Sequence, residues 1–348
     1  MDGNRVLTGT RSFAGRQIVL DHGTGARLSR ELVEYVVAVL GDVYIGQMED
    51  SAVLSVAAGQ LAMTTDSFVV DPPFFGNGDV GKIAVCGTVN DLAVIGATPK
   101  YLTLGMIIEA GLPVAALTRV LESIRETARQ AGVLIVAGDT KVVRPGEADQ
   151  IYLNTTGIGV FERTPLRMTD VRAGDQIVLS GPIGNHTVHL LSVREGLGFE
   201  SRVSSDCAPL NGLITEAFES VEDGAVRSVR DVTRGGLAAV LHEYAKALGA
   251  GLRIDEQALP VDPEVKMACD MLGIDPLNTA NEGCVCLFLD PGAVERVLAA
   301  LHSHPYGRRA VVVGEVADDT ESAVRMRDRD GHIRILEELQ GAELPRLC

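Results

Sequence analysis

The stretch Gly87-Thr-Val-Asn-Asp-Leu-Ala-Val-Ile-Gly-Ala-Thr-Pro99 decides the fold. Apolar residues recur from Val80 to Leu92 and predict a helix there, yet Asn90 and Asp91 interrupt the pattern. Asn and Asp are poor helix-forming residues because their side chains compete for backbone hydrogen bonds. We therefore expect these two side chains to take part in chemistry rather than to serve the helix.

Four more aspartates stand beside apolar runs or next to Gly and Thr. Asp50 precedes such a run, Asp66 and Asp139 each end one, and Asp231 begins the segment Asp231-Val-Thr-Arg-Gly-Gly236. Carboxylates next to buried runs are costly unless they are paired or bind metal, and a divalent cation removes the repulsion between converging carboxylates. Taken singly, each is also the residue type that caps helices and turns. Together they predict a cation site, and Mg²⁺ bridging carboxylates to nucleotide phosphates fits it best.

The two common nucleotide-binding motifs are absent from the sequence. There is no GxxxxGKS or GxxxxGKT segment and no strand–GxGxxG–helix arrangement. A nucleotide site in this chain must therefore be of another kind.

Composition narrows the class of protein. The net charge of −16 disfavours nucleic acid and anionic lipid as partners. Of six cysteines only Cys284 and Cys286 are close, so a zinc or disulfide framework is not expected, and we interpret both as core residues. The polar N-terminus predicts no signal peptide, and no apolar run is long enough to span a bilayer. We expect a cytoplasmic protein with no membrane contact.

The 348 residues suggest about two domains of mixed helices and strands. The polar stretch 164–175, which contains Pro and Gly, is the best boundary. We predict a first domain over 1–165 and a second over 170–348, of class α+β, with a flexible tail over about 337–348. The expected helices are 28–40, 80–92, 114–131, 236–248 and 293–302; the expected strands are 133–136, 151–160, 176–180, 284–289, 310–316 and 333–336, with a hairpin formed by 52–57 and 61–65.

The motifs, in their order, resemble the PurM-like ATP-binding superfamily. That superfamily includes aminoimidazole ribonucleotide synthetase, selenophosphate synthetase, thiamine monophosphate kinase and HypE. The segments that carry the resemblance cover about residues 20–285, and they are Asp50-Ser-Ala-Val, Thr64-Thr-Asp66, Gly87 to Pro99, Gly138-Asp139-Thr140, Asp231 to Gly236 and Asn281-Glu282-Gly283.

Three further segments resemble the HypE family of hydrogenase-maturation proteins. His22-Gly-Thr-Gly-Ala-Arg-Leu28 is similar to its HGxGG motif, with Ala26 in place of the second glycine of the pair. Gly181-Pro-Ile-Gly-Asn-His186 is similar to a HypE loop, although Asn185 stands where aspartate is common. The ending Pro345-Arg-Leu-Cys348 resembles the HypE ending Pro-Arg-Ile/Val-Cys. The alternative for this ending is a disordered terminus that happens to finish in cysteine.

The resemblance implies a two-domain PurM-like fold. Its N-terminal domain would form a shared β-barrel in a homodimer, followed by a C-terminal α/β domain. It also implies ATP and Mg²⁺ as cofactors. By motif position, the candidates for binding ATP are Asp50, Thr64, Thr65, Asp66, Asn90, Asp91, Gly138, Asp139 and Asp231, and the five aspartates among them are the candidates for the metal.

The activity that the resemblance implies is the ATP-dependent dehydration of an S-carbamoyl group on Cys348 to a thiocyanate, which supplies cyanide to the iron of a [NiFe] hydrogenase. Glu282 is the candidate base, and Lys141 the candidate group for orienting or protonating the leaving oxygen. A HypF-like carbamoyltransferase would load Cys348, and a HypC–HypD-like complex would receive the cyanide. The rivals are a small-molecule kinase, a selenophosphate synthetase-like enzyme and a non-catalytic maturation scaffold. His22 to Leu28 lacks the reactive cysteine that a selenophosphate synthetase needs, and a scaffold has no need of the aspartates.

Overall fold

Residues 17–23, 27–45, 59–319 and 321–338 are described by the structure, a computed structural model. The described chain divides into two units: unit 1 runs up to Leu92 and resumes over Pro99–Val160, and unit 2 comprises Ala93–Thr98 and the described residues from Phe161 to Glu338. Among the described residues, no helix is long and apolar enough to cross a membrane.

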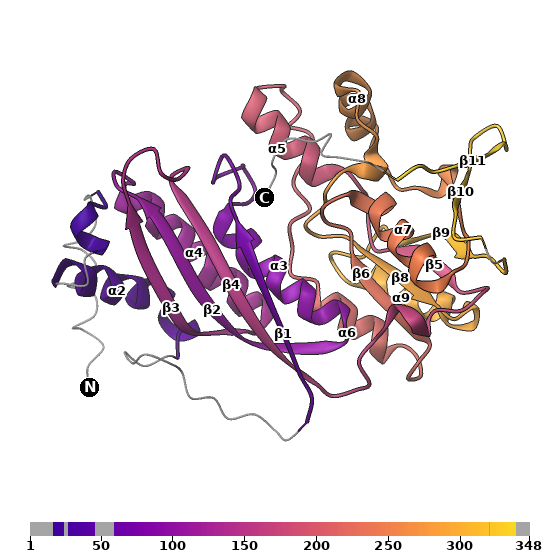
Figure 1. Ribbon diagram of the computed structural model, residues 1–348, viewed down its shortest axis with the longest axis horizontal. Coiled ribbons are helices and arrows are strands. Elements are labelled where there is room, and N and C mark those ends of the chain that lie inside the picture. The colour runs from indigo at the N-terminus through magenta and orange to yellow at the C-terminus, as the bar shows by residue number, and fades with distance from the viewer. Residues whose placement is uncertain (1–16, 24–26, 46–58, 320, 339–348) are drawn as a thin grey trace. The chain divides into compact units, whose positions relative to one another are not determined.

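Unit 1 is a four-stranded sheet with helices (Figure 1). Its elements are η1 (Leu20–Gly23), α2 (Arg27–Leu40), η2 (Gly41–Val43), β1 (Leu61–Phe68), α3 (Val80–Val94), β2 (Ala97–Glu109), α4 (Val114–Ala131), β3 (Leu134–Val143) and β4 (Ile151–Phe161). The strand order is β1-β4-β2-β3, with β1 antiparallel to β4 and β2 parallel to β3.

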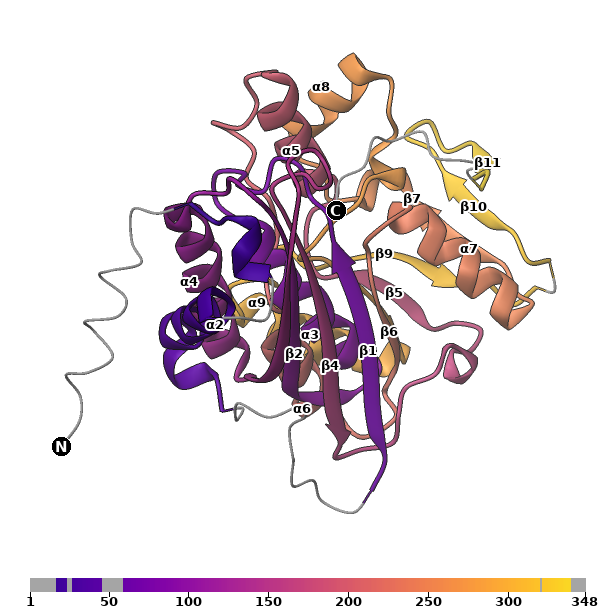
Figure 2. The ribbon, with the colours of Figure 1, turned by 60° about the vertical axis from the view of Figure 1, so that its left-hand side comes forward.

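The two faces of this sheet differ. Helices α3 and α4 lie on one face, as both views show (Figures 1 and 2). Within unit 1 no described helix covers the opposite face, where Leu61, Met63 and Ile107 are 51%, 74% and 42% exposed. We call this opposite surface of β1, β4, β2 and β3 the open face. Because side chains alternate along a strand, each strand sends one set of residues to the helices and one to the open face.

The two helices on the covered face are built differently. α4 is amphipathic, and its buried residues recur at helical spacing from Val114 to Ala131 before Gly132, in the left-handed conformation with φ 71°, ends the helix. α3 is apolar on nearly every side, and Thr88 and Thr155 satisfy each other there through hydroxyls 2.5 Å apart. A helix so thoroughly buried can hold Asn90 and Asp91 only where they have polar neighbours.

Unit 2 contains a seven-stranded sheet of order β11-β10-β7-β9-β5-β8-β6. Its strands are β5 (Gln176–Leu179), β6 (Val226–Asp231), β7 (Leu252–Asp255), β8 (Val285–Leu289), β9 (Val311–Val316), β10 (Val324–Arg327) and β11 (Ile333–Ile335). Its helices are η3 (Met168–Asp170), α5 (Asn185–Glu195), α6 (Asn211–Glu219), α7 (Gly236–Leu248), η4 (Glu256–Ala258), α8 (Pro263–Leu272), η5 (Pro276–Asn278), η6 (Pro291–Ala293) and α9 (Val294–Ser303).

Strand β8, inside this second sheet, is buried on both faces. Cys286 and Phe288 of β8 join one core with α7, in which the ring of Phe288 stacks on Tyr244 at 4.0 Å between centroids. Val285, Leu287 and Leu289 point the other way and join a second core with α6 and α9. A strand covered on both sides must be apolar throughout, which explains the continuous run 284–289. The interpretation of Cys284 and Cys286 as core residues is confirmed, since both are buried.

The structure corrects several sequence expectations. Asp66 and Asp139 do not end their strands: β1 continues to Phe68 and β3 to Val143. The arm 61–65 of the expected hairpin belongs to β1, which pairs with β4, and the other arm lies outside the described residues. No strand was expected over 97–109, where β2 lies, because Pro99 and Gly105 weaken its alternating pattern.

Candidate functional site

Two of the predicted aspartates, Asp66 of β1 and Asp91 of α3, lie where these two elements pack together. Thr64 Oγ1 donates a hydrogen bond of 2.9 Å to Asp91 Oδ2. Asp66, two residues further along the same side of β1, reaches α3 one turn before Asp91, because a Cβ atom at Gly87 would lie 3.3 Å from Asp66 Oδ2. Positions 87 and 91 are one turn apart on the same face of α3. The carboxylates of Asp66 and Asp91 therefore lie along that face.

Asn90 and Thr65 lie beside this pair but are oriented differently. Asn90 is 4% exposed within α3. Thr65 points to the open face, where its hydroxyl accepts hydrogen bonds from Thr156 Oγ1 at 3.0 Å and from Asn154 Nδ2 at 3.4 Å. Within unit 1, Thr64 is therefore the threonine of the pair that contacts a predicted site carboxylate.

Asp139 and Lys141 form a second polar group on β3. Lys141 Nζ lies 2.9 Å from Asp139 Oδ2, and the hydrogen bond from Lys141, with its charge, holds the pKa of the Asp139 carboxyl below its usual value. Pairing aligns them with Gly105 and Ile107, so they lie on the open face. β3 is three strands from β1, about 14 Å at 4.8 Å per strand. Within one copy of unit 1, Asp139 and Lys141 are thus separate from the Asp66–Asp91 pair.

The remaining predicted residues are Gly138 in unit 1, two residues in unit 2, and two that lie outside the described residues. Asp231 is the last residue of β6, with a side chain that is 13% exposed, and Glu282 is 6% exposed. Gly138 lies in β3, where a Cβ would meet Leu104 O at 2.7 Å, so the strand pair β2–β3 requires glycine there. Asp50 and Cys348 fall outside the described residues.

Asn281 joins separate segments of unit 2 through its side chain. It was not among the predicted site residues. It is fully buried; its Oδ1 accepts a hydrogen bond from Gly184 N at 2.7 Å, and its Nδ2 donates to the carbonyls of Val232 at 3.0 Å and Thr279 at 3.1 Å. One side chain thus joins the Gly181–Gly184 turn to the residue after Asp231. The segment Asn281-Glu282-Gly283 pointed to this place, but nothing in it distinguished Asn281 as the connector.

The Asn185 departure from the HypE pattern has a local explanation. Asn185 Nδ2 donates a hydrogen bond of 3.0 Å to Asp262 Oδ2. Arg309 pairs with the other oxygen of Asp262. An aspartate at position 185 would place a second carboxylate against Asp262, so the amide is the compatible partner in this chain.

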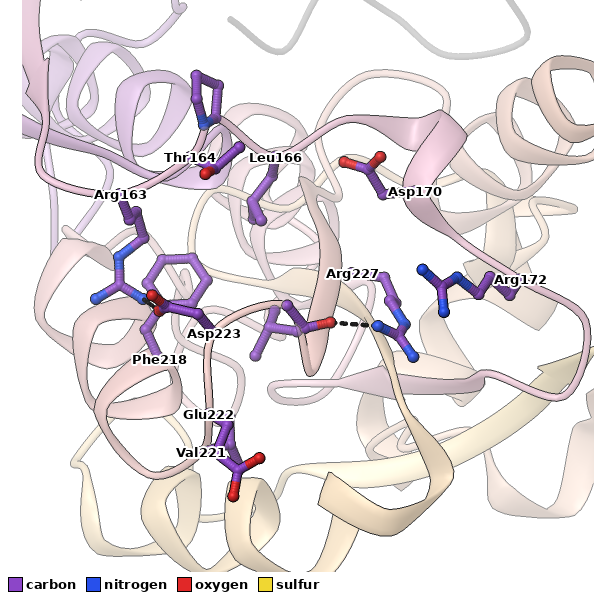
Figure 3. A pocket seen from close by; sticks show the side chains of 13 residues that line it. Arg163, Thr164, Leu166, Asp170, Arg172, Phe218, Val221, Glu222, Asp223 and Arg227 are labelled. Carbon is purple, nitrogen blue, oxygen red and sulfur yellow. Dashed lines mark hydrogen bonds and ion pairs between the residues drawn. The ribbon is translucent and has the colours of Figure 1, made fainter. Parts of the chain in front are cut away.

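A separate cavity of about 350 Å³ in unit 2 contains none of the predicted site residues (Figure 3). Two of its arginines are already engaged: the Arg163 guanidinium lies 4.3 Å from the centre of the Phe218 ring, and Arg227 Nη2 donates to Asp290 at 2.6 Å. The cavity also contains Asp170, Glu222 and Asp223, which balance its three arginines. These features favour a structural polar cluster over a binding site.

Comparison with known protein families identifies two successive domains in the chain. Residues 48–161 match the N-terminal domain, and residues 172–327 the C-terminal domain, of AIR synthase related protein. The carbamoyl dehydratase HypE of Azotobacter vinelandii is 43% identical over 329 residues, which cover 94% of this chain and 96% of that protein.

Solved structures give the same result. The hydrogenase maturation protein HypE in complex with ATP superposes with a TM-score of 0.90 at 40% identity, covering 95% of this chain and all of that one. A chain of a HypE–HypF complex superposes with a TM-score of 0.77 at 44% identity, covering 82% and 92% of the two chains. With both AIR synthase-related domains in place and similarity along nearly its whole length, the chain belongs to the carbamoyl dehydratase HypE family.

Proposed function

We propose that this protein is an ATP-dependent carbamoyl dehydratase, which converts an S-carbamoyl group on Cys348 to a thiocyanate. The observation that carries the proposal is the similarity to the A. vinelandii carbamoyl dehydratase over 94% of this chain. The ending Leu344-Pro-Arg-Leu-Cys348 supplies the thiol on which the group would be carried. The product would provide the cyanide ligand of a [NiFe] hydrogenase iron.

The chemistry requires activation of an amide oxygen. A primary amide loses water slowly because its oxygen is a poor leaving group and its N–H is weakly acidic. Attack of the carbamoyl oxygen on the γ-phosphate of ATP forms an O–P bond and releases ADP. Removal of two N–H protons and cleavage of the C–O bond then yield S–C≡N and phosphate. The carbamoyl oxygen therefore leaves in the phosphate.

The acidic groups of unit 1 fit a nucleotide-bound Mg²⁺. Asp66 of β1 lies against the face of α3 that carries Asp91. Thr64 donates a hydrogen bond to one oxygen of Asp91. Two carboxylates so placed suit a small hard cation that prefers oxygen ligands. Such an ion would offset negative charge on the transferring phosphoryl group. Asp50, Asp139 and Asp231 remain candidates for the same task.

Glu282 and Lys141 are proposed to manage protons. Glu282, nearly buried in unit 2, would accept the N–H protons, and Lys141 would orient or protonate the leaving oxygen. Lys141 Nζ lies 2.9 Å from Asp139 Oδ2, and both side chains are more than half exposed, so the amine can reach a ligand.

A homodimer is proposed through the open face of unit 1. Leu61, Met63 and Ile107 expose apolar side chains on this face. Covering them with a second copy would join the four-stranded sheets of both copies into one shared β-barrel. Lys141 and Asp139 would then lie at that interface. A HypF-like carbamoyltransferase, as in the related HypE–HypF complex, and a HypC–HypD-like cyanide acceptor are the further partners that we propose, in the cytoplasm.

The decisive experiment follows the mass of the C-terminal peptide. Purified protein is incubated with the carbamoyltransferase, carbamoyl phosphate and Mg-ATP. The expected result is addition of a carbamoyl group to Cys348, followed by loss of one water only with hydrolysable ATP. Cys348→Ser is the control and should gain no carbamoyl. An unmodified Cys348, with ATP still consumed on a small molecule, would instead support a kinase.

A further inference from the structure

The backbone of Glu282 is held on both sides by one loop segment of unit 2. Glu282 N donates a hydrogen bond of 3.0 Å to Asp206 Oδ1. Two residues after Asp206, Ala208 N donates to Glu282 O at 3.3 Å. The peptide groups on both sides of Glu282 are therefore fixed by segment 206–208, which is 76 residues away in the sequence.

Gly283, the residue after Glu282, brings the two segments into main-chain contact. A Cβ atom at Gly283 would lie 1.8 Å from the backbone oxygen of Asp206, so the two segments touch along their main chains. Burial, with a contribution from the Asp206 charge, raises the pKa of the Cys284 thiol to about 12. Asp206 thus lies just before β8, with its carboxylate at Glu282 N and its backbone oxygen against Gly283.

The holding segment is itself anchored in the core. Ser205 Oγ accepts a hydrogen bond from Cys207 N at 3.1 Å and lies 2.8 Å from Nδ1 of the fully buried His186. Burial lowers the pKa of His186 to about 3, so its imidazole is neutral at physiological pH. A neutral ring on α5 therefore fixes Ser205, and through it the position of Asp206.

The contact between Asp206 and Glu282 differs from an ordinary turn cap. Asp328 caps its own hairpin, because its Oδ1 accepts hydrogen bonds from Asp330 N at 2.9 Å and His332 N at 2.8 Å. Such local caps serve the loop that contains them. Asp206 instead accepts from a residue distant in sequence, and that residue is the proposed base.

We propose that Asp206 is a positioning residue for the dehydration: its carboxylate sets the direction in which the Glu282 side chain leaves the backbone. The inference rests on the proposed function, in which Glu282 accepts the N–H protons. A general base must lie within hydrogen-bond reach of the proton that it removes, so a small rotation of the backbone at Glu282 separates the base from its substrate. Asp206 acts through Glu282 and does not itself touch the substrate.

The test compares Asp206→Ala, Asp206→Asn and Asp206→Glu, with Asp328→Ala as the matched loss of a turn cap. For each protein, Cys348 is first carbamoylated. Loss of water in a single turnover is then followed by mass spectrometry, beside the Kd for Mg-ATP and the melting temperature. We expect Asp206→Ala to slow dehydration about 100-fold with an unchanged Kd, because a misplacement of about 1 Å has that effect. Asp206→Asn, which keeps the acceptor oxygen, should restore most of the rate, and Asp328→Ala should dehydrate at the wild-type rate.

Several results would overturn the inference. One is a wild-type rate in a folded Asp206→Ala protein, and another is an equal loss in the Asn and Ala variants. A third is the same slowing in Asp328→Ala, which would indicate general destabilisation. If Asp206→Ala does not fold, Asp206→Glu decides, because its longer side chain must shift Glu282 and slow the reaction. Wild-type protein that never loses water from carbamoylated Cys348 would overturn the proposed function and this inference together, whereas unaffected variants beside an active wild type would overturn only the inference.

Discussion

Thr64 on β1 donates its hydroxyl hydrogen to Asp91 Oδ2 on α3 across 2.9 Å, and this bond fixes one of the two carboxylates that lie over the Gly87–Asp91 face of α3. A threonine on a strand thereby determines the orientation of an acidic group on a helix. Thr65 points to the opposite side of the same strand, where its hydroxyl accepts a hydrogen bond from Thr156 instead.

Thr64→Val should weaken Mg-ATP binding about tenfold. Valine keeps the shape of threonine and removes the hydroxyl, and a hydrogen bond to a charged group contributes about 1.5–3 kcal/mol. Calorimetric titration with Mg-ATP measures the effect. Thr127→Val, which removes a hydroxyl bonded to Ser123 O within α4, should bind Mg-ATP as the wild type does. Equal affinities for the two variants would contradict a special role for Thr64.

Much of this site was predictable from local pattern, and the part that was not has a physical reason. Asn90 and Asp91 attract notice because they interrupt an apolar helix, and Asp91 does contact β1, through Thr64. Which threonine would face Asp91 depends on the register of β1, where a shift of one residue exchanges the two faces. No short-range pattern reports that register.

Long-range contacts explain the other omissions. The hydrogen bond from Glu282 to Asp206 joins residues 76 positions apart, and that from Gly184 to Asn281 joins residues 97 apart. Asp206 stands in an ordinary polar segment, 204–206, with no periodicity around it. The separation of Asp139 from Asp66 likewise follows from the strand order β1-β4-β2-β3, which the order of the motifs along the chain does not predict.

Replacing Asp66 or Asp91 should raise the Mg²⁺ concentration that dehydration requires. Asp66→Asn and Asp91→Asn each remove one negative charge while keeping an oxygen, so the ion is attracted less. We expect the Mg²⁺ concentration for half-maximal dehydration to rise about tenfold or more, since even removing a residue that only supports a metal ligand costs about 10–100-fold in affinity. Asp71→Asn, in the loop after β1, is the control. An unchanged Mg²⁺ requirement in both variants would remove these residues from the metal site.

Asn281→Ala should destabilise unit 2 more than any exposed amide substitution. It would leave Gly184 N and the carbonyls of Val232 and Thr279 without this partner in a fully buried position. Each buried polar group left unsatisfied costs about 1–3 kcal/mol, so we expect a loss of about 3 kcal/mol in the free energy of unfolding. Urea unfolding measures it. Gln257→Ala, which removes an exposed hydrogen bond to Arg329 O, should cost well under that. Similar losses in both would refute the connecting role of Asn281.

His186 should make the protein less stable as the pH falls from neutrality. Burial lowers its pKa from 6.5 to about 3 in the folded state, whereas the unfolded chain takes up a proton below about 6.5. Between these values the unfolded state binds the additional proton, so acid favours unfolding, by up to about 2 kcal/mol at pH 5. His186→Asn removes the titrating ring and keeps a polar group near Ser205. Its stability should therefore fall less than that of the wild type between pH 7 and 5 in urea titrations. An identical fall in stability between pH 7 and 5 in the wild type and in His186→Asn would show that His186 is not the source of the pH dependence.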